Sequence, residues 1–228
     1  MAAIGPTVQG IGRRSAGPGN ADTRIFQAHN IMVMAAQISP VPAPGEERSV
    51  ALALINTEIE PRGQRLDLVP DARALAGWLR AHDVKVGGGA IGEEELDRMR
   101  ELRGAIRTAF LARAAGTRPA AGAIRQINSA AALVPATPRV QWRDGRLIQT
   151  KVWTGAARPA DRALAAIAAD AIGTLLGDSG KRLRLCEAHG CNRMFIAVHR
   201  RRRWCSRSCG DRVRVARHYR RVNRSRSS

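Results

Sequence analysis

All four cysteines of the chain lie in one 24-residue segment near its C-terminal end, arranged as two close pairs. Four residues separate Cys186 from Cys191, and three separate Cys205 from Cys209. Thiolates are preferred ligands of Zn²⁺, and two short pairs can present four sulfurs tetrahedrally to one ion. The sequence therefore predicts one structural zinc ion held by Cys186, Cys191, Cys205 and Cys209.

Two disulfides or four ordinary thiols are the alternatives to a zinc site. The N-terminal residues contain no apolar core typical of a secretory signal, and no stretch approaches the length of a membrane span. We therefore expect a cytoplasmic protein with no membrane partner, in a compartment where thiols stay reduced. His189 or His199 could replace a thiolate, but the four cysteines already complete the shell. A closed shell argues against a catalytic zinc, which needs an open position.

Positive charge is concentrated in the same region. The 228 residues include 38 Lys and Arg against 19 Asp and Glu, a net charge of +19. Residues 181–228 hold sixteen of these basic residues and two acids, so they carry +14 of that charge. A general compositional bias would not gather the charge in about a fifth of the chain. The C-terminal end is therefore where we expect an anionic partner, nucleic acid above all.

The segment after Cys209 is predicted to form a basic amphipathic helix. Arg214, Arg217 and Arg221 fall on one side at helical spacing, whereas Val215 and Tyr219 fall on the other, where they could pack against the zinc site. The alternative is a charged helix that is merely solvated, but four more arginines precede Cys205. The predicted nucleic-acid contacts are Arg200, Arg201, Arg202, Arg203, Arg207, Arg212, Arg214, Arg217, Arg220, Arg221 and Arg224.

The middle of the chain reads as mainly α, because aromatic residues are only 4% and the apolar residues follow helical periodicity. Residues 49–55 fit either a buried strand or a short helix. Helices are predicted at 71–82 with Asp71 as N-cap, from 93 through 110, at 120–133 and at 159–176, and a β-hairpin is predicted around Asp144-Gly145. The predicted core residues are Leu75, Trp78, Leu79, Leu96, Met99, Leu102, Ile106, Phe110, Ile124, Ile127, Leu164, Ile167, Ile172 and Leu175.

Two stretches resemble a known bacterial family. The segment RRRWCSRSCGDRVRVARHYRR resembles the CGNR zinc finger, with Asp211 in place of the family's Asn. Upstream, LALINTEIEPRGQRLDLVPDARALAGWL resembles the opening of the ABATE domain, with landmarks at Asn56-Thr57, Arg62-Gly63 and Asp67-Leu68. The resemblance implies a mostly helical domain joined to a zinc module, in a transcription regulator that is induced by stress. We expect Asp211 to cap the basic helix as Asn would, since the two residues are similar N-caps.

The expected organisation is a disordered extension at 1–47, a helical domain with a small β-hairpin at 48–180, and a four-cysteine zinc finger ending in a basic helix at 181–224. The expected function is zinc-dependent binding of double-stranded DNA by a transcriptional regulator, whose helical domain senses a small-molecule effector or forms a homodimer. RNA or ribosome binding is the main alternative, and binding of an acidic protein partner is another. An enzyme with a pocket at Asn56 and Arg62 is a third, although both residues equally fit turn and capping roles. No catalytic motif is present, so we expect no enzyme.

Overall fold

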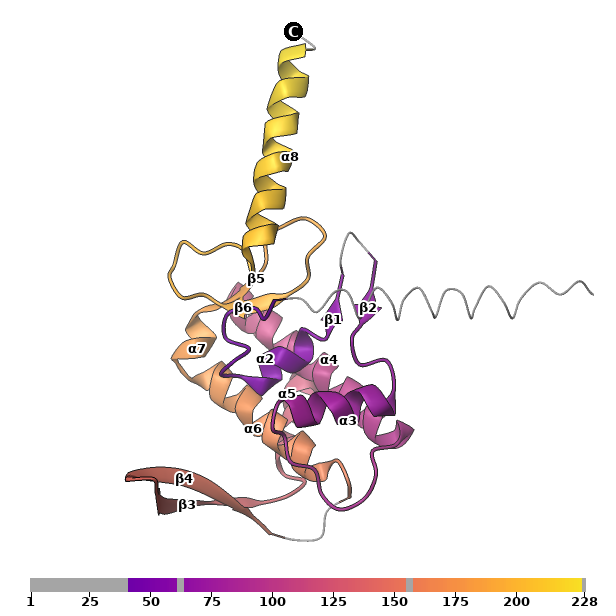
Figure 1. The fold of residues 1–228 in the computed structure, drawn as a ribbon, viewed down its shortest axis with the longest axis vertical. Helices are drawn as coiled ribbons and strands as arrows, with labels where there is room; N and C mark the ends of the chain where they lie inside the picture. Colours follow the sequence, from indigo (N-terminus) through magenta and orange to yellow (C-terminus); the bar gives the residue numbers. More distant parts are fainter. Residues whose placement is uncertain (1–40, 61–63, 155–157, 227–228) are drawn as a thin grey trace, which may run out of the picture. The chain divides into compact units, whose positions relative to one another are not determined.

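The computed structural model describes residues 41–60, 64–154 and 158–226 of the chain (Figure 1). Residues 1–40 of the predicted extension and the predicted Arg62-Gly63 landmark lie outside these described residues. The helices are α2 (Val50–Ile55), α3 (Ala72–Ala81), α4 (Glu93–Ala115), α5 (Ala121–Ala131), α6 (Asp161–Leu176), α7 (Asp178–Lys181) and α8 (Arg207–Arg226). The strands form three antiparallel pairs, β1 (Glu58–Ile59) with β2 (Leu66–Asp67), β3 (Ala136–Arg143) with β4 (Arg146–Trp153), and β5 (Leu183–Leu185) with β6 (Met194–Ile196).

The predicted fold class, mainly helical with small antiparallel sheets, is confirmed, and side-chain caps explain where several helices begin. The open choice at 49–55 is resolved as a helix, because the Ser49 hydroxyl accepts a hydrogen bond from the Leu52 N–H at 3.2 Å. Asp71 caps α3 as predicted, accepting from the Ala74 N–H at 2.7 Å. The last predicted helix begins at Asp161 rather than at Pro159.

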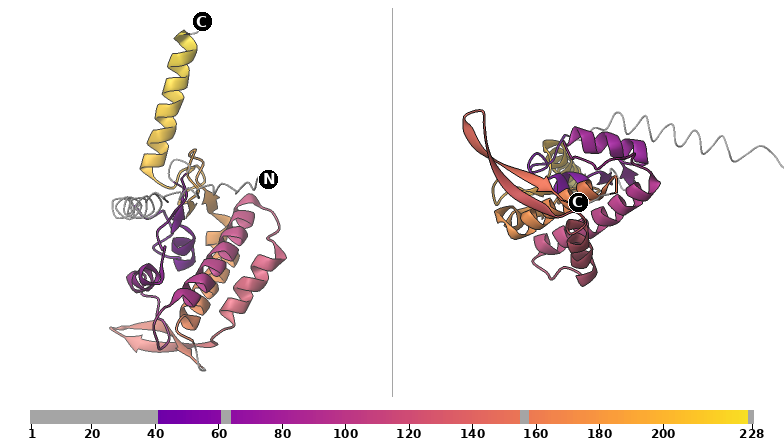
Figure 2. Two further views of the ribbon diagram at one scale, coloured as in Figure 1. Left: turned by 90° about the vertical axis from the view of Figure 1, so that its right-hand side faces the viewer. Right: turned by 90° about the horizontal axis from the view of Figure 1, so that it is seen from below.

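Helices α4, α5 and α6 pack side by side and share one apolar core with α2 and α3 (Figure 2). The predicted stripe of α4 is confirmed, since each of its five members is buried. Trp78, Ile124, Ile172 and Leu175 lie at the edge of this core and are only partly buried. The other predicted core residues are buried, namely Leu75, Leu79, Leu96, Met99, Leu102, Ile106, Phe110, Ile127, Leu164 and Ile167.

The predicted β-hairpin forms β3 and β4. Asp144 (φ 49°) and Gly145 (φ 75°) both take the left-handed conformation, as a two-residue turn with matching twist requires. The register places Arg143 opposite Arg146 and Trp142 opposite Leu147. Every residue of β3 is exposed, so the hairpin contributes little to the helical core.

Strand β6 separates two hydrophobic cores. Successive side chains of a strand point to opposite faces, and here Met194 and Ile196 enter the helical core while Phe195 and Ala197 enter a second, smaller core that contains the cysteines. The zinc-finger region is therefore packed directly on the helices. The smaller core consists of Ala43, Cys186, Ala188, Phe195, Ala197, Cys205 and Cys209, flanked by Cys191, Trp204 and Val213.

Residues 41–47, which the sequence analysis places in a disordered extension, are ordered against this second core. Ala43 is fully buried, and the Pro44 carbonyl accepts a hydrogen bond from the Ile196 N–H at 2.8 Å. Gly45 has a φ of +101° and lies against the Ile196 side chain. Residues 41–47 therefore pack against the zinc-finger region as part of its structure.

None of the helices in the described part of the chain combines the length and the apolar composition needed to cross a lipid bilayer.

Candidate metal centre and nucleic-acid interface

The four cysteine sulfurs converge on one point, and each lies within 4.8 Å of the other three. The Cys191 and Cys205 sulfurs are 3.8 Å apart, and those of Cys205 and Cys209 are 3.7 Å apart. Four sulfurs each about 2.3 Å from a tetrahedral Zn²⁺ would be separated by about 3.8 Å. The donor set and its spacing therefore fit one structural zinc ion, as the sequence predicts.

The backbone holds these sulfurs at the end of the β5–β6 sheet. The Cys186 N–H donates to the Arg193 carbonyl at 2.9 Å, which extends the strand pairing by one residue. The Cys205 N–H donates to the Cys186 sulfur at 3.4 Å and so joins the two cysteine pairs. Cys186, Cys205 and Cys209 are buried, and Cys191 is partly buried.

The thiols perturb one another's protonation. Hydrogen bonds from Cys191 and from Cys205 lower the pKa of Cys186 to about 2. The hydrogen bond to Cys186 raises the pKa of Cys191 to about 11, and the same interaction raises the pKa of Cys205. Among these three thiols the hydrogen bonds therefore favour Cys186 as the one that carries negative charge, and a second thiolate beside it would be repelled. A bound divalent cation would offset this repulsion and allow further thiols to ionise.

Two arginines and a tryptophan brace the loop that carries the second cysteine pair. The guanidinium of Arg202 donates to the carbonyls of Trp204 at 3.0 Å and Cys205 at 3.2 Å, and it lies 5.8 Å from the centre of the Phe195 ring. Arg212 donates to the Cys209 sulfur at 3.4 Å. Trp204 packs on the cysteine core. Arg202 is thus already engaged inside the fold.

Gly210 shows why the residue after the last cysteine is small. A Cβ added there would lie 3.1 Å from a ring carbon of Trp204. The close approach of α8 to the tryptophan therefore depends on the missing side chain, which explains the glycine of the Cys-Gly-Asp-Arg tetrad in this chain.

Asn56, a landmark of the upstream resemblance, connects the helical region to the finger. Its side-chain amide donates to the Met194 carbonyl at 2.8 Å, and its side-chain oxygen accepts from the Met194 N–H at 2.9 Å. The same amide nitrogen donates to Glu46 at 2.5 Å. Asn56 also ends α2 through its backbone, as a turn residue would. Its side chain is thus fully used within the fold and does not line an open pocket.

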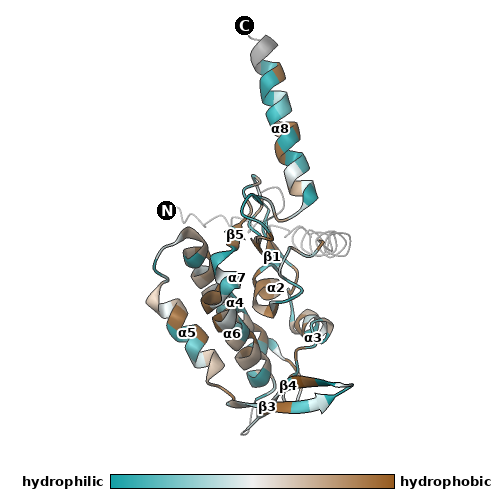
Figure 3. Ribbon diagram, turned by 90° about the vertical axis from the view of Figure 1, so that its left-hand side faces the viewer, coloured by the Kyte–Doolittle hydropathy of each residue, from teal (hydrophilic) through white to brown (hydrophobic). Residues whose placement is uncertain are grey.

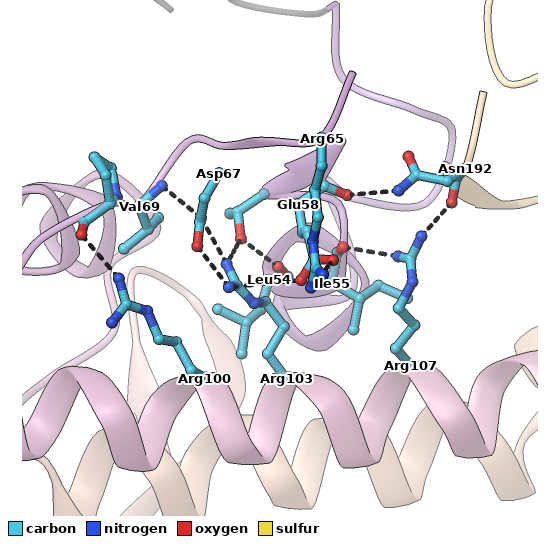
Figure 4. A network of polar contacts seen from close by, with 12 residues as sticks. Leu54, Ile55, Glu58, Arg65, Asp67, Val69, Arg100, Arg103, Arg107 and Asn192 are labelled. Atoms are coloured by element: carbon cyan, nitrogen blue, oxygen red, sulfur yellow. Dashed lines mark hydrogen bonds and ion pairs between the residues drawn. The ribbon is translucent and has the colours of Figure 1, made fainter. Parts of the chain in front are cut away.

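Helix α4 contributes a second connection, shown in Figure 4. Arg107 donates to the Ile55 carbonyl at 3.0 Å and to the Asn192 carbonyl, next to Cys191, at 2.6 Å. Burial, as the largest cause, lowers the pKa of Arg107. One turn earlier on α4, Arg103 forms a paired contact with Asp67 at 2.6 and 2.8 Å and also reaches Thr57.

Arg193 provides the third connection. It is buried, and it donates to the Val41 carbonyl at 3.0 Å and to Glu46 at 2.8 Å. Sequence reasoning missed Arg193, Arg107 and the role of Asn56, because their partners are distant along the chain. The available signal was the apolar spacing of α4, which places Arg103 and Arg107 one turn apart, directly after Leu102 and Ile106 of the buried stripe.

The predicted basic helix is confirmed as a helix, but it begins at Arg207, two residues before Cys209. Ser206 caps it, accepting from the Cys209 N–H at 3.2 Å. The expected capping role of Asp211 is therefore wrong, because Asp211 lies in the second turn and pairs with Arg214. Figure 3 shows α8 as hydrophilic along most of its length.

The expected packing of the apolar side of α8 on the zinc site is also wrong. Only the first turns contact the second core, through Cys209 and Val213. Val215 and Tyr219 lie farther along the helix and remain 54% and 64% exposed. A straight helix that leaves the surface of the finger cannot bring later turns back to it.

The structure brings most of the predicted nucleic-acid residues to one region around α8 and the preceding loop. Arg203 pairs with Glu187 at 2.6 Å, and this contact raises its pKa. A groove of 380 Å³ lies between α8 and the 187–189 loop, lined partly by Arg217 and Arg220. Arg224 lies within α8. The predicted residues that are exposed and form neither an ion pair nor a side-chain hydrogen bond with other described residues are Arg200, Arg201, Arg207, Arg217, Arg220 and Arg221.

Comparison with known proteins agrees with this architecture. Residues 48–179 match the ABATE family, described as "Putative stress-induced transcription regulator", and residues 182–222 match the CGNR zinc finger. No curated protein matches the chain. Because the first match covers more than half of the sequence, the chain belongs to the ABATE family and carries a CGNR zinc finger after its helical domain.

Proposed function

We propose that this protein binds double-stranded DNA through α8 and the loop before Cys205, and that it regulates transcription by doing so. The observation that carries the proposal is the set of six exposed arginines, on α8 and in the loop before Cys205, that form neither an ion pair nor a side-chain hydrogen bond with other described residues. Guanidinium groups spaced along a helix suit contacts with successive phosphates, and α-helices fit the DNA major groove.

Three observations favour duplex DNA over the alternatives. Single-stranded RNA is usually bound by stacking, yet Trp204 packs on the finger core and Tyr219 alone of the finger's aromatic residues stays well exposed. An acidic protein surface would also attract these positive charges, but it would not require them to lie on a helix, whereas the DNA major groove accommodates one. An enzyme site at Asn56 has no free polar group there, since its amide is used within the fold. We accordingly propose no catalytic activity.

The proposed compartment is the cytoplasm. All four cysteines are free thiols arranged for one metal ion, and such a site persists where thiols remain reduced.

The test compares two variants with the same change in charge. Arg217→Ala/Arg220→Ala/Arg221→Ala removes three cations from α8, and the control Arg139→Ala/Arg143→Ala/Arg146→Ala removes three exposed cations from the β3–β4 hairpin. Duplex affinity of the zinc-loaded protein is measured across a salt series. The slope of log affinity against log salt should fall by about 2 to 3 in the α8 variant. Equal effects of the two variants would contradict an α8 interface.

Sequence selection is the second part of the test. Enrichment of one motif from a random duplex pool would support a regulator, whereas salt-dependent binding without enrichment would contradict specific readout. Single-stranded RNA serves as the competitor, and preferential binding of RNA would favour the alternative.

We further propose that a second copy of the chain covers the exposed hairpin. Val140, Trp142 and Leu147 share one face of β3–β4, and Trp142 is 71% exposed. Such a two-stranded ribbon is only marginally stable alone, and a homodimer would supply the second finger that specific DNA binding usually needs. Sedimentation should show a dimer that Trp142→Asp dissociates. A wild-type monomer at about 100 µM, near the upper end of ordinary assay concentrations, would exclude this homodimer.

A further inference from the structure

A hollow of about 850 Å³ lies where α7 meets one end of the β5–β6 sheet, at the start of β5 and just after β6, opposite the end that leads to Cys186. One wall is the segment from Asp178 to Arg184, and the other is the segment from Ala197 to Arg200. The Ala197 N–H donates to the Arg182 carbonyl at 2.8 Å and fastens the walls together. The volume lies within the range of ordinary small-molecule sites.

The lining is strongly cationic. Lys181, Arg182, Arg184 and Arg200 face a single acid, Asp178, and His199 adds a further nitrogen donor. Asp178 is bound to Lys181 at 2.9 Å, so one of the four cations is already neutralised. The three arginines, Arg182, Arg184 and Arg200, therefore keep their positive charges without a carboxylate in the lining to neutralise them.

Arg184 is the fixed member of this set. It is partly buried, and its Nη1 donates to the carbonyls of Leu183 at 2.7 Å and Lys181 at 3.2 Å. These bonds orient the guanidinium and leave Nε and Nη2 without partners among the described residues. Arg182 and Arg200 are exposed and also form no ion pair there. Guanidinium groups match phosphate oxygens in geometry and charge.

We propose that this hollow binds phosphate groups of a multiply charged ligand and constitutes a site separate from α8. Among the described residues its lining has no Phe, Tyr or Trp on which a base could stack; its apolar side chains are Ala197 and Val198, and its one aromatic ring is the small imidazole of His199. Recognition would thus depend on the phosphates rather than on a base. The phosphates could belong to a free polyphosphate compound or to a nucleic-acid backbone, and the experiment separates these sources.

The position of the hollow gives the ligand a means of influencing the finger. Lys181 follows the helical domain directly, whereas Arg200 begins the arginine loop that leads to Cys205. A ligand contacting both would connect the end of the helical domain to this loop. The hollow is in this sense a candidate effector site. Phosphate binding in the hollow does not depend on whether α8 binds DNA.

The experiment measures binding of tripolyphosphate to the zinc-loaded full chain by titration calorimetry. Arg182→Gln/Arg184→Gln alters the hollow without touching α8 or Arg200, and Arg139→Gln/Arg146→Gln on the hairpin is the matched control. We expect affinity to fall about tenfold or more in the first variant and less than about twofold in the control. Arg182→Gln alone, at an exposed position, provides the same test if Arg184 is needed for folding.

Duplex DNA then identifies the source of the phosphates. If the hollow variant loses tripolyphosphate binding but keeps duplex affinity, the ligand is a free phosphorylated compound. If it loses both and tripolyphosphate competes with the duplex, the hollow holds the nucleic-acid backbone. The proposal is wrong if tripolyphosphate fails to bind, or binds the wild type and the variants equally. The α8 variant reports separately on the proposed function, since its loss of DNA binding should leave tripolyphosphate affinity unchanged.

Discussion

Asn56 holds Met194 by two hydrogen bonds, one to its N–H at 2.9 Å and one to its carbonyl at 2.8 Å. The two residues are 138 positions apart, at the end of α2 and the start of β6. An amide side chain that pairs with both polar groups of one residue imitates a neighbouring strand. The contact therefore satisfies the free edge of β6 and fixes the finger on the helical domain.

The first prediction concerns this contact. Asn56→Ala would leave both backbone groups of Met194 buried without partners, so the free energy of unfolding should fall by about 2 to 4 kcal/mol. Urea denaturation of the zinc-loaded protein measures the change. Asn128→Ala, at an exposed position of α5, is the control and should alter stability by less than about 0.5 kcal/mol. A small effect at Asn56 would mean that the junction contributes little to folding.

The second prediction concerns the metal. Cys209→Ser should lose the ion and unfold the finger, because metal binding supplies folding free energy in such sites. Since β6 is shared by both cores, chelation of zinc should also lower the melting temperature of the helical domain. Metal analysis checks the loss of zinc, and thermal denaturation followed by the circular-dichroism signal of the helices checks the melting temperature. Ser208→Ala, beside the cysteine, should keep stoichiometric zinc, and a cysteine variant that does so would refute the four-thiolate site.

The third prediction uses two glycines with opposite expected effects. At Gly45, an added Cβ would lie 2.7 Å from Ile196 in a backbone with φ +101°, so Gly45→Ala should destabilise the protein by about 2 kcal/mol or more. At Gly104, in the exposed interior of α4, nothing lies within 4 Å of the added atom. Gly104→Ala should therefore stabilise by about 0.5 to 1 kcal/mol. Equal signs in denaturant titrations would contradict the ordered turn at 43–48.

The fourth prediction contrasts Trp204 with Tyr219, two aromatic residues of the finger. Trp204 packs on the cysteine core, so Trp204→Ala should cost about 2 to 3 kcal/mol and weaken zinc retention. Tyr219 is 64% exposed, and Tyr219→Ala should change stability by less than about 0.5 kcal/mol. Zinc retention under a chelator and thermal melting distinguish them. A large loss at Tyr219 would show that the outer turns of α8 are packed after all.

The fifth prediction concerns pH. Burial would raise the pKa of Asp161, but hydrogen bonds from Arg98 at 2.5 Å and from the Arg158 N–H at 2.9 Å outweigh it and lower the pKa. A carboxylate with a lowered folded-state pKa stabilises the fold above its unfolded pKa, near 3.8, and loses that contribution as pH falls through the folded value.

Asp161→Asn should accordingly cost about 2 kcal/mol at pH 7, and this difference should shrink as the pH falls below about 4. Unfolding free energies of both proteins between pH 3 and 7 provide the measurement, because loss of zinc at low pH affects both alike. Asp144→Asn, in the exposed hairpin turn, is the control. A difference that grows toward low pH would reverse the assigned sign.

Features encoded by neighbouring residues could be predicted from the sequence. The metal ligands follow from two cysteine pairs of short spacing, and the hairpin turn follows from Asp144-Gly145, because each pattern acts within a few residues. The α4 stripe was equally predictable from its apolar spacing, as was the Asp71 cap of α3. Local patterns therefore predicted the elements, and the family resemblance predicted a helical domain joined to a zinc module.

The roles of individual polar residues could not be predicted in this way. Asp67 and Asn56 stand in a loop-like stretch, yet their partners are Arg103 and Met194, which only packing brings near. Arg202 has the same local sequence as its neighbours, but it alone points its guanidinium at the Cys205 carbonyl. Charge and spacing do not distinguish an arginine that stabilises a loop from one that is available to bind a phosphate.

The sequence by itself determined the metal-binding chemistry, the helical character of the chain and the place where positive charge gathers, because these depend on residue type and on spacing along one element. Only the tertiary structure decided that β6 is shared by two cores, that residues 41–47 pack against the finger, and that Val215 and Tyr219 of α8 remain exposed. The physical reason is that burial and hydrogen-bond satisfaction depend on segments far apart in sequence, whose approach is set by the packing of the whole chain.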